Sequence, residues 1–286
     1  MLTSLNSALS GLDAFQQQMD IIGNNIANLN TTGFKSANTN LVDSFSDTLQ
    51  AAAAAGTSTP GTNAMQIGTG VTTGSITNDW SQGTINLTGI TSNLAINGNG
   101  FFVVQDPTTN TQYVTQDGTF TVNSQGYLVT SAGMEVVGYN TSSNGTVSTS
   151  STGPVSINIS GSSSTAAMTG YTINAQGVIT VTQADGTTSS CGQILLQNFT
   201  NPQGLTSVGN NMFSNQANIA GASALSTPGS STTGVGTIQS GALELSNVDL
   251  STQMANLIIA QRGFEANSKI ITTSDELLQT VVNMKH

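Results

Sequence analysis

Two terminal segments carry apolar residues at a spacing of seven, and this pattern constrains the fold more than any other feature of the chain. Over about residues 2–31, one apolar row recurs every seven residues and a second row lies three residues further on. All eight positions are apolar, which is typical of a coiled-coil seam. An ordinary amphipathic helix on a core is the alternative that so short a repeat leaves open. The rows are Leu5, Leu12, Met19 and Ile26, and Ala8, Phe15, Ile22 and Leu29.

The C-terminal segment, about residues 245–284, repeats the pattern less completely. One row is unbroken, whereas polar residues interrupt the expected partner row, in which Met254 and Val282 fit. Asp249 and the preceding Ser246–Asn247 are candidate N-caps. Because an isolated helix with an exposed apolar stripe is unstable, we expect the two terminal helices to pair. The unbroken row is Leu243, Leu250, Leu257, Phe264, Ile271 and Leu278.

The region between the termini has the pattern of β-structure. Runs of β-branched and aromatic residues alternate with dipeptides that favour tight turns. The predicted fold class is therefore α+β, with paired terminal helices and a nested, mostly antiparallel β region. The turn dipeptides are Asn97-Gly98, Asp117-Gly118, Gln125-Gly126, Gln176-Gly177 and Asp185-Gly186.

Changes in composition along the chain suggest four parts. Residues 1–35 with 243–286 are expected to form the coiled-coil domain, and residues 36–75 a connecting region. A β domain is expected from residues 76–139 with 200–242. Residues 140–199, which begin with a Ser/Thr-rich stretch, are expected to form a small outer β domain or insertion.

The charge distribution excludes several classes of function. Only 6% of the residues are charged, against roughly 25% in an average soluble protein. Residues 36–261 contain no Lys or Arg, so the clustered cations that bind nucleic acid or an anionic membrane are missing. No apolar run approaches the length of a membrane span, and no cleavable signal peptide is expected at the N-terminus.

The sequence offers little material for catalysis or for a cofactor. Cys191 is the single cysteine and His286 the single histidine, so no intrachain disulfide and no metal site are expected. The carboxylates are scattered, and Trp80 is the single tryptophan, which is a poor basis for a sugar-cleaving cleft. We therefore expect neither an enzyme nor a cofactor-binding protein.

Two terminal motifs resemble the signatures of flagellar rod, hook and hook-associated proteins. The first is the run GNNIANLNTTGFKSA over residues 23–37, and the second lies within residues 240–285. IGTGV at residues 67–71 and LAINGNGFF at residues 94–102 are also similar to this family. The matching motif residues are Asn24, Asn25, Ile26, Ala27, Asn28, Thr32, Gly33, Phe34 and Lys35, and Asn247, Val248, Asp249, Gln261 and Arg262.

The resemblance implies a structural subunit of the bacterial flagellum that is exported unfolded through the flagellar type III apparatus. Such proteins polymerise with themselves into a hollow helical tube whose inner core is built by the terminal helices. Other rod proteins, hook-associated proteins and the cap are the implied partners. The resemblance further implies that the spacing-seven rows form the assembly seam, made of Leu5, Leu12, Phe15, Met19, Ile22, Ile26 and Leu29 with Leu250, Leu257, Phe264, Ile271 and Leu278.

Within the flagellar axis, the resemblance favours a hook protein, with a subunit of the distal rod as the alternative. The amino-acid sequence of the C-terminal run is most similar to that of short hook proteins. A hook protein would couple the motor rod to the filament from outside the cell. The IGTGV motif and the chain length also suit a subunit of the distal rod. A β-rich cell-surface adhesin is the alternative from another class, although an adhesin would not need paired terminal heptads.

Overall fold

The structure is a computed structural model that describes residues 2–54, 61–140, 154–159, 168–214, 221 and 224–284. The chain divides into two compact units. Unit 1 contains the ranges Met1–Ala27, Ser36–Asp79 and Val248–His286, and unit 2 contains Asn28–Lys35 and Trp80–Asn247.

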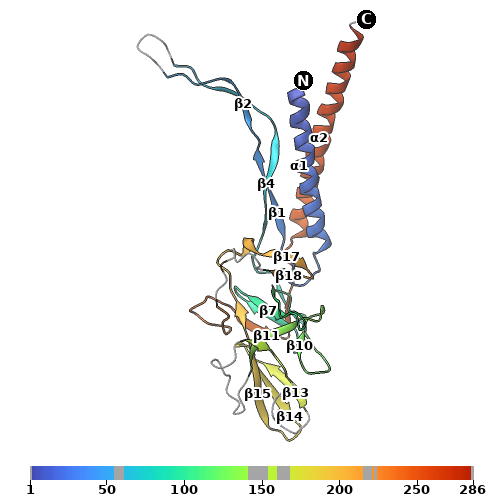
Figure 1. Ribbon diagram of the computed structural model, residues 1–286. Coiled ribbons are helices and arrows are strands. Elements are labelled where there is room, and N and C mark those ends of the chain that lie inside the picture. The colour runs from blue at the N-terminus through green and yellow to red at the C-terminus, as the bar shows by residue number, and fades with distance from the viewer. Residues whose placement is uncertain are drawn as a thin grey trace. The chain divides into compact units, whose positions relative to one another are not determined.

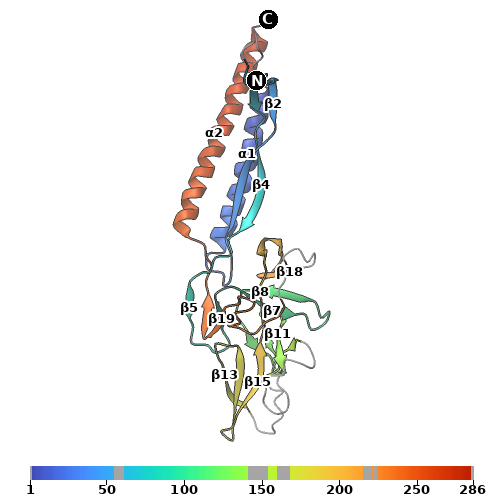
Figure 2. The same ribbon diagram turned by 90° about the vertical axis from the view of Figure 1, so that its left-hand side faces the viewer.

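Unit 1 is built around two helices that lie side by side and run in opposite directions (Figures 1 and 2). They are α1 (Leu2–Ala27) and α2 (Leu250–Asn283). Asp249 is the N-cap of α2, because its carboxylate accepts hydrogen bonds from Ser251 N at 2.9 Å and Thr252 Oγ1 at 3.0 Å. The Ser251 backbone bond, followed by the Thr252 hydroxyl bond, holds the pKa of Asp249 below its ordinary value of 3.8.

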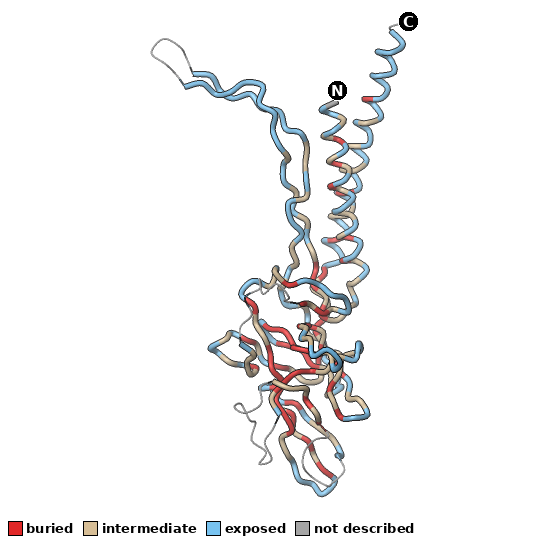
Figure 3. Tube along the Cα trace, in the orientation of Figure 1, coloured by how far each residue is buried: buried red, intermediate tan, exposed pale blue. Residues whose placement is uncertain are grey.

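Unit 1 also contains a two-stranded ribbon in the segment for which the sequence predicted only a connecting region. Strand β1 (Ala37–Asp43) pairs with β4 (Val71–Asn78), and β2 (Ser46–Gln50) pairs with β3 (Met65–Gly68), both antiparallel. Every residue of β2 and β3 is exposed, as the tube in Figure 3 shows.

Unit 2 holds one large antiparallel sheet with the path β13-β14-β15-β11-β7-β8-β18-β17. Four short strands join it beside this path: β9 and β10 form a hairpin next to β11, β12 pairs with β11, and β16 pairs with β7. The strands are β7 (Phe101–Gln105), β8 (Gln112–Thr115), β9 (Thr121–Val122), β10 (Leu128–Val129), β11 (Glu135–Asn140), β12 (Val155–Ser156), β13 (Met168–Ile173), β14 (Val178–Gln183), β15 (Thr188–Ile194), β16 (Leu196–Gln197), β17 (Thr206–Gly209) and β18 (Met212–Ser214), with a 3-10 turn η1 (Pro202–Gly204).

The C-terminal end of unit 2 pairs with an early part of the same unit. Strand β19 (Thr237–Ser240) pairs with β6 (Leu94–Asn97), and β20 (Ala242–Glu244) pairs with β5 (Ile85–Leu87). Segments roughly 150 residues apart in the sequence thus lie side by side just before the chain enters α2. The predicted α+β class, with helices at both ends and a mostly antiparallel β middle, is confirmed.

Strand β7 is the centre of the unit 2 core because it is buried on both faces. Phe102 and Val104 belong to one apolar cluster, whereas the alternating residues Phe101 and Val103 belong to a second cluster on the opposite face. A strand that is buried on both faces has a continuous apolar run in its sequence. In β7 this run is FFVV, which directly follows the segment LAINGNG.

Candidate functional site

The helix pair in unit 1 is held by close approach at small residues. A side chain at Gly263 would meet the ring of Phe15, and one at Gly11 would meet the side chain of Asn267. At the other end of the pair, Asn25 Nδ2 lies 3.3 Å from Gln253 Oε1. The three contacts share one antiparallel register: from one contact to the next, the residue number increases on α1 by the same amount as it decreases on α2.

The second row of α2 differs from the one that the sequence favoured. The unbroken row of α2 contributes Leu257, Phe264 and Ile271 to the contact with α1. The second row in this contact lies three residues after each position of the unbroken row. Met254 and Val282, which the sequence placed in the second row, are exposed. The residues of the observed second row are small or polar, which allows the helices to approach closely but buries little apolar surface. This row is Gln253, Ala260, Asn267 and Ser274.

The predicted seam residues differ in their surroundings. Ile22 is buried, and the remaining ones on α1 are half-buried, as are the central ones on α2. Leu250 and Leu278 are exposed, and Leu29 lies beyond the end of α1. The half-buried residues are Leu5, Leu12, Phe15, Met19 and Ile26 on α1, and Leu257, Phe264 and Ile271 on α2.

A second face of α1 holds the ribbon through polar contacts. Ser10 Oγ accepts from Val71 N at 3.2 Å, and Thr73 Oγ1 donates to Gln17 Oε1 at 2.6 Å. Asn25, which is fully buried, donates from Nδ2 to the carbonyl of Ala37 at 2.8 Å and accepts from Ala37 N at 3.0 Å. Asn25 therefore connects α1, the start of β1 and α2, and a residue without a carboxamide cannot replace all three bonds.

The rest of the N-terminal motif lies in unit 2, where Lys35 forms a buried ion pair. Lys35 Nζ lies 2.7 Å from Glu244 Oε1, and the two side chains are only 3% and 4% exposed. Lys35 Nζ also donates to the carbonyl of Ser81 at 2.8 Å, and Glu244 Oε1 accepts from Gly83 N at 2.8 Å. The pair joins residues 209 positions apart. Glu244 was not among the predicted site residues, although it lies inside the C-terminal motif run.

Gly33 and Thr32 fix the loop that leads to Lys35. Gly33 has a φ of +67°, and a Cβ there would lie 2.7 Å from Asp117 N, so both conformation and space require glycine. Gly33 N donates to the carbonyl of Glu244 at 2.9 Å. Thr32 Oγ1 donates to Asp117 Oδ1 at 2.9 Å, and the carbonyl of Thr32 accepts from Asn211 Nδ2 at 2.7 Å.

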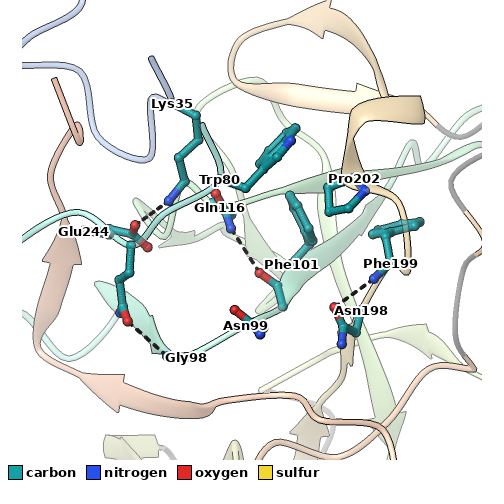
Figure 4. A pocket seen from close by; sticks show the side chains of 12 residues that line it. Lys35, Trp80, Gly98, Asn99, Phe101, Gln116, Asn198, Phe199, Pro202 and Glu244 are labelled. Carbon is teal, nitrogen blue, oxygen red and sulfur yellow. Dashed lines mark hydrogen bonds and ion pairs between the residues drawn. The ribbon is translucent and has the colours of Figure 1, made fainter. Parts of the chain in front are cut away.

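The buried pair borders a cavity of about 160 Å³ (Figure 4). Lys35 and Glu244 are the charged residues among those that line it, and they neutralise each other. Gln116 lies beside them and donates from Nε2 to the carbonyl of Gly100 at 3.3 Å. Trp80, Phe101, Phe199 and Pro202 supply an apolar wall. Among the described residues that line the cavity, no nucleophile is paired with a base.

The C-terminal motif residues have separate local roles. Asn247 Nδ2 donates to Ser81 Oγ at 3.1 Å, and Val248 is buried. Asp249 caps α2, and Gln261 is exposed. Arg262 Nη1 forms an ion pair with Glu265 Oε2 at 2.8 Å, with side chains 78% and 64% exposed.

The described residues contain no group of three or more His, Cys, Asp or Glu side chains arranged to hold a metal ion. None of the helices in the described ranges is long and apolar enough to cross a membrane.

Three family models match parts of the chain that together cover more than half of it. Residues 5–35 match "Flagella basal body rod protein", residues 95–181 match "Flagellar hook protein FlgE/F/G D1 domain", and residues 239–284 match "Flagellar basal body rod FlgEFG protein C-terminal". The flagellar basal-body rod protein FlgG of Bacillus subtilis is 40% identical over 285 residues and is covered completely, as is this chain. The chain belongs to the flagellar rod and hook protein family.

Other members of the flagellar rod and hook family match with lower identity. FlgG of Caulobacter vibrioides is 34% identical over 289 residues, covering 99% of this chain and all of the relative. The flagellar hook protein FlgE of Borreliella burgdorferi is 26% identical across an alignment of 447 residues that covers both chains completely.

Family membership confirms the prediction of a structural subunit of the flagellar axis, located in the flagellum. It supports this function over the adhesin alternative. It also implies assembly with other axial proteins of the flagellum. The matched ranges 5–35 and 239–284 contain the matching residues of both terminal motifs, including those that form the Lys35–Glu244 pair and the helix seam.

Proposed function

We propose that this chain is a subunit of the distal rod, the alternative to the hook position that the sequence favoured. The observation that carries the proposal is the full-length match to basal-body rod proteins, at 40% and 34% identity with almost no difference in length. The hook relative is more distant, and its 447-residue alignment requires long insertions relative to the 286 residues of this chain.

The proposed mechanism of assembly uses surfaces that a single copy leaves exposed on α2. Large apolar side chains cover much of the helix outside its contact with α1, and soluble monomers rarely expose so many. We attribute these side chains to contacts with neighbouring copies and with the other axial proteins. They are Met254, Ile258, Ile259, Ile270, Leu277, Val281 and Val282.

The ribbon supports the same proposal. Phe45 is 87% exposed, and Leu49, Met65 and Ile67 are also exposed on the β2–β3 pair. A two-stranded ribbon is at best marginally stable in water, and its open edges favour pairing with other chains. Contacts with neighbouring subunits would stabilise it.

The proposed role is structural, without catalysis, and export through the flagellar type III apparatus is part of the proposal. The cavity beside Lys35 supports a structural role, because its charged residues are neutralised by each other. The apolar faces of α2 and the ribbon supply the material for self-assembly.

The test is to locate the subunit in isolated hook–basal bodies. An epitope inserted in the turn between β14 and β15, at Asp185–Gly186, lies in an exposed hairpin turn at which Gly186 has positive φ. Immunogold confined to the straight rod is the expected result. Gold along the curved hook would assign the chain to the hook instead, and absence of gold from both, with the epitope shown to be accessible, would contradict an axial position.

A further inference from the structure

The outward face of α1 carries two acidic residues, and that of α2 carries two basic residues at the same spacing, beside the acidic Glu265 and Glu276. Asp13 and Asp20 are exposed on α1, and Arg262 and Lys269 are exposed on α2, each pair seven residues apart. Seven residues are close to two helical turns, so both members of a pair lie on one face, about 10 Å apart along the axis.

Both faces point away from the contact between the two helices. At 100° per residue, Asp13 and Asp20 lie about 200° and 180° around α1 from Gly11, which faces α2. Arg262 and Lys269 lie about 200° and 180° around α2 from Ala260, which is fully buried. The acidic and basic pairs of one copy therefore cannot meet each other, but they are open to a neighbour.

The register of the helix pair shows how a neighbour would fit. Since Phe15 lies opposite Gly263 and Gly11 opposite Asn267, Arg262 is level with Gln16 and Lys269 is level with Leu9. Asp20 and Asp13 lie four residues further along α1 in both cases. A neighbouring copy that is shifted along the helix axis by four residues, or about 6 Å, in the direction of the N-terminal end of α1 therefore has both acids of its α1 level with both bases of α2 in the first copy.

We propose that α2 of one copy docks on α1 of a second copy of this chain, with Arg262 opposite Asp20 and Lys269 opposite Asp13. The inference rests on the proposed function of a self-assembling axial subunit and specifies one of its contacts. Arg262 would then be shared between Asp20 of the neighbour and its own Glu265, which it already binds at 2.8 Å.

Charge also determines the kind of association. The outward face of α1 carries only acidic charges, so two α1 faces repel each other and a symmetric α1–α1 contact is disfavoured. Pairing α1 of one copy with α2 of the next is a heterologous contact, which leaves one free face at each end and repeats into an open helical array. Exposed ion pairs contribute mainly to register and specificity.

Cysteine pairs in the full chain, produced in its own cells in place of the wild type, test the register. Asp13→Cys with Lys269→Cys, and separately Asp20→Cys with Arg262→Cys, should give a ladder of disulfide-linked multimers from isolated basal bodies on a non-reducing gel. The mismatched pair Asp13→Cys with Arg262→Cys is about 10 Å out of register and should give no ladder. The single variants control for the buried Cys191.

Charge reversal provides the second measurement. Asp13→Lys alone and Lys269→Glu alone should each reduce incorporation into basal bodies, and the two together should restore it. Glu276→Lys is the matched control, because it replaces an acid with a lysine, as Asp13→Lys does, at a position of α2 that lies opposite the uncharged Asn6 of the neighbour. This variant should assemble normally.

Three results would overturn the inference. Matched cysteine pairs that give no ladder, in basal bodies that contain the chain, would refute this contact while leaving the rod proposal intact. Cross-links only to a protein of different mass would show that the partner is another axial protein. Absence of the wild-type chain from basal bodies would refute the rod proposal, and with it this inference.

Discussion

Lys35 is the only basic residue of unit 2, and its side chain is 97% buried against Glu244. A buried ion pair is weak evidence for stability, because desolvation opposes the attraction between the charges. Removing one partner is different, since it leaves an uncompensated charge in the interior. We infer that the N-terminal motif fixes the position of its loop against strand β20. Gly33 allows the close approach of the loop to Asp117, and Lys35 binds Glu244 on β20, the last strand before α2.

We expect Lys35→Met to destabilise unit 2 by about 3–5 kcal/mol, because Glu244 would stay buried without a cation. The measurement is urea unfolding followed by the fluorescence of Trp80, the single tryptophan, which lies in unit 2. Adding Glu244→Gln should recover part of the loss, since the amide oxygen can still accept from Gly83 N. Lys269→Met, at an exposed lysine, is the control and should change stability by less than about 0.5 kcal/mol. An equally small effect of Lys35→Met would argue against the buried pair.

Asp249 gives a pH-dependent contribution to the start of α2. Its pKa is lowered in the folded chain by the bonds from Ser251 and Thr252, so the stabilisation is complete above the ordinary pKa of 3.8 and is lost as the pH falls through the lower folded value. Asp249→Ala should lower the melting temperature of the helices at pH 7, and the difference from wild type should disappear in acid below pH 3.8. Circular dichroism across pH measures this. A difference that stays constant into acid would show that the carboxylate is not the cause.

At the scale of elements, the helices separate residues that hold one copy together from residues left for other copies. Ile22 is 4% exposed in the contact between α1 and α2, whereas Ile259 is 64% exposed on α2. Ile22→Asp should lose helical circular dichroism as well as assembly, because it buries a charge. Ile259→Asp should keep the helical signal of the monomer and lose assembly only. Thr272→Asp, an exposed polar position on the same helix, should keep both, and normal polymers of Ile259→Asp would contradict a role of this face in assembly.

Sequence reasoning predicted the elements whose signals are local. The α1 row and the N-cap at Asp249 follow from spacing and residue type, and Gln176-Gly177 and Asp185-Gly186 do turn hairpins, between β13 and β14 and between β14 and β15. Asp117-Gly118 does not, since the flanking strands β8 and β9 do not pair with each other; glycine is needed at position 118 by the close approach of the Leu94 carbonyl. That approach depends on tertiary packing, which a dipeptide does not encode.

The same limit applies to the candidate site. The partner row of α2 consists of Gln253, Ala260, Asn267 and Ser274, which carry no apolar signal, and they face α1 because Gly11 and Gly263 allow the backbones to approach. The Lys35–Glu244 pair joins two strongly charged residues far apart in the sequence, and only the pairing of β19 and β20 with β6 and β5 brings Glu244 into place.

For the whole molecule, the distribution of charge limits which surfaces can form ion pairs between copies. The chain carries a net charge of −10 and four basic residues. Of these, Lys35 is buried and already paired, and Arg262 and Lys269 are exposed on α2, while Lys285 lies outside the described residues. Within the described part of the chain, a contact that matches charges between copies therefore has to involve α2.

The two units also differ in what stabilises them without neighbours. The core of unit 2 has two apolar clusters around β7, whereas the helix contact of unit 1 is built largely from small and polar residues. Helices stabilised by so little apolar burial are marginal in water. We therefore expect the monomer to unfold in two steps, with the helices of unit 1 melting first.

Two signals distinguish these steps in a single urea titration. Far-ultraviolet circular dichroism follows α1 and α2, the long helices of unit 1, and Trp80 fluorescence follows unit 2. The dichroism should be lost at lower urea than the fluorescence changes, which a single cooperative transition does not allow. Lys35→Met should move the fluorescence transition and leave the dichroism transition in place, because its charge pair lies wholly within unit 2. Coincident transitions in the wild type, shifted together by this variant, would show instead that the helices are stabilised only as part of the whole chain.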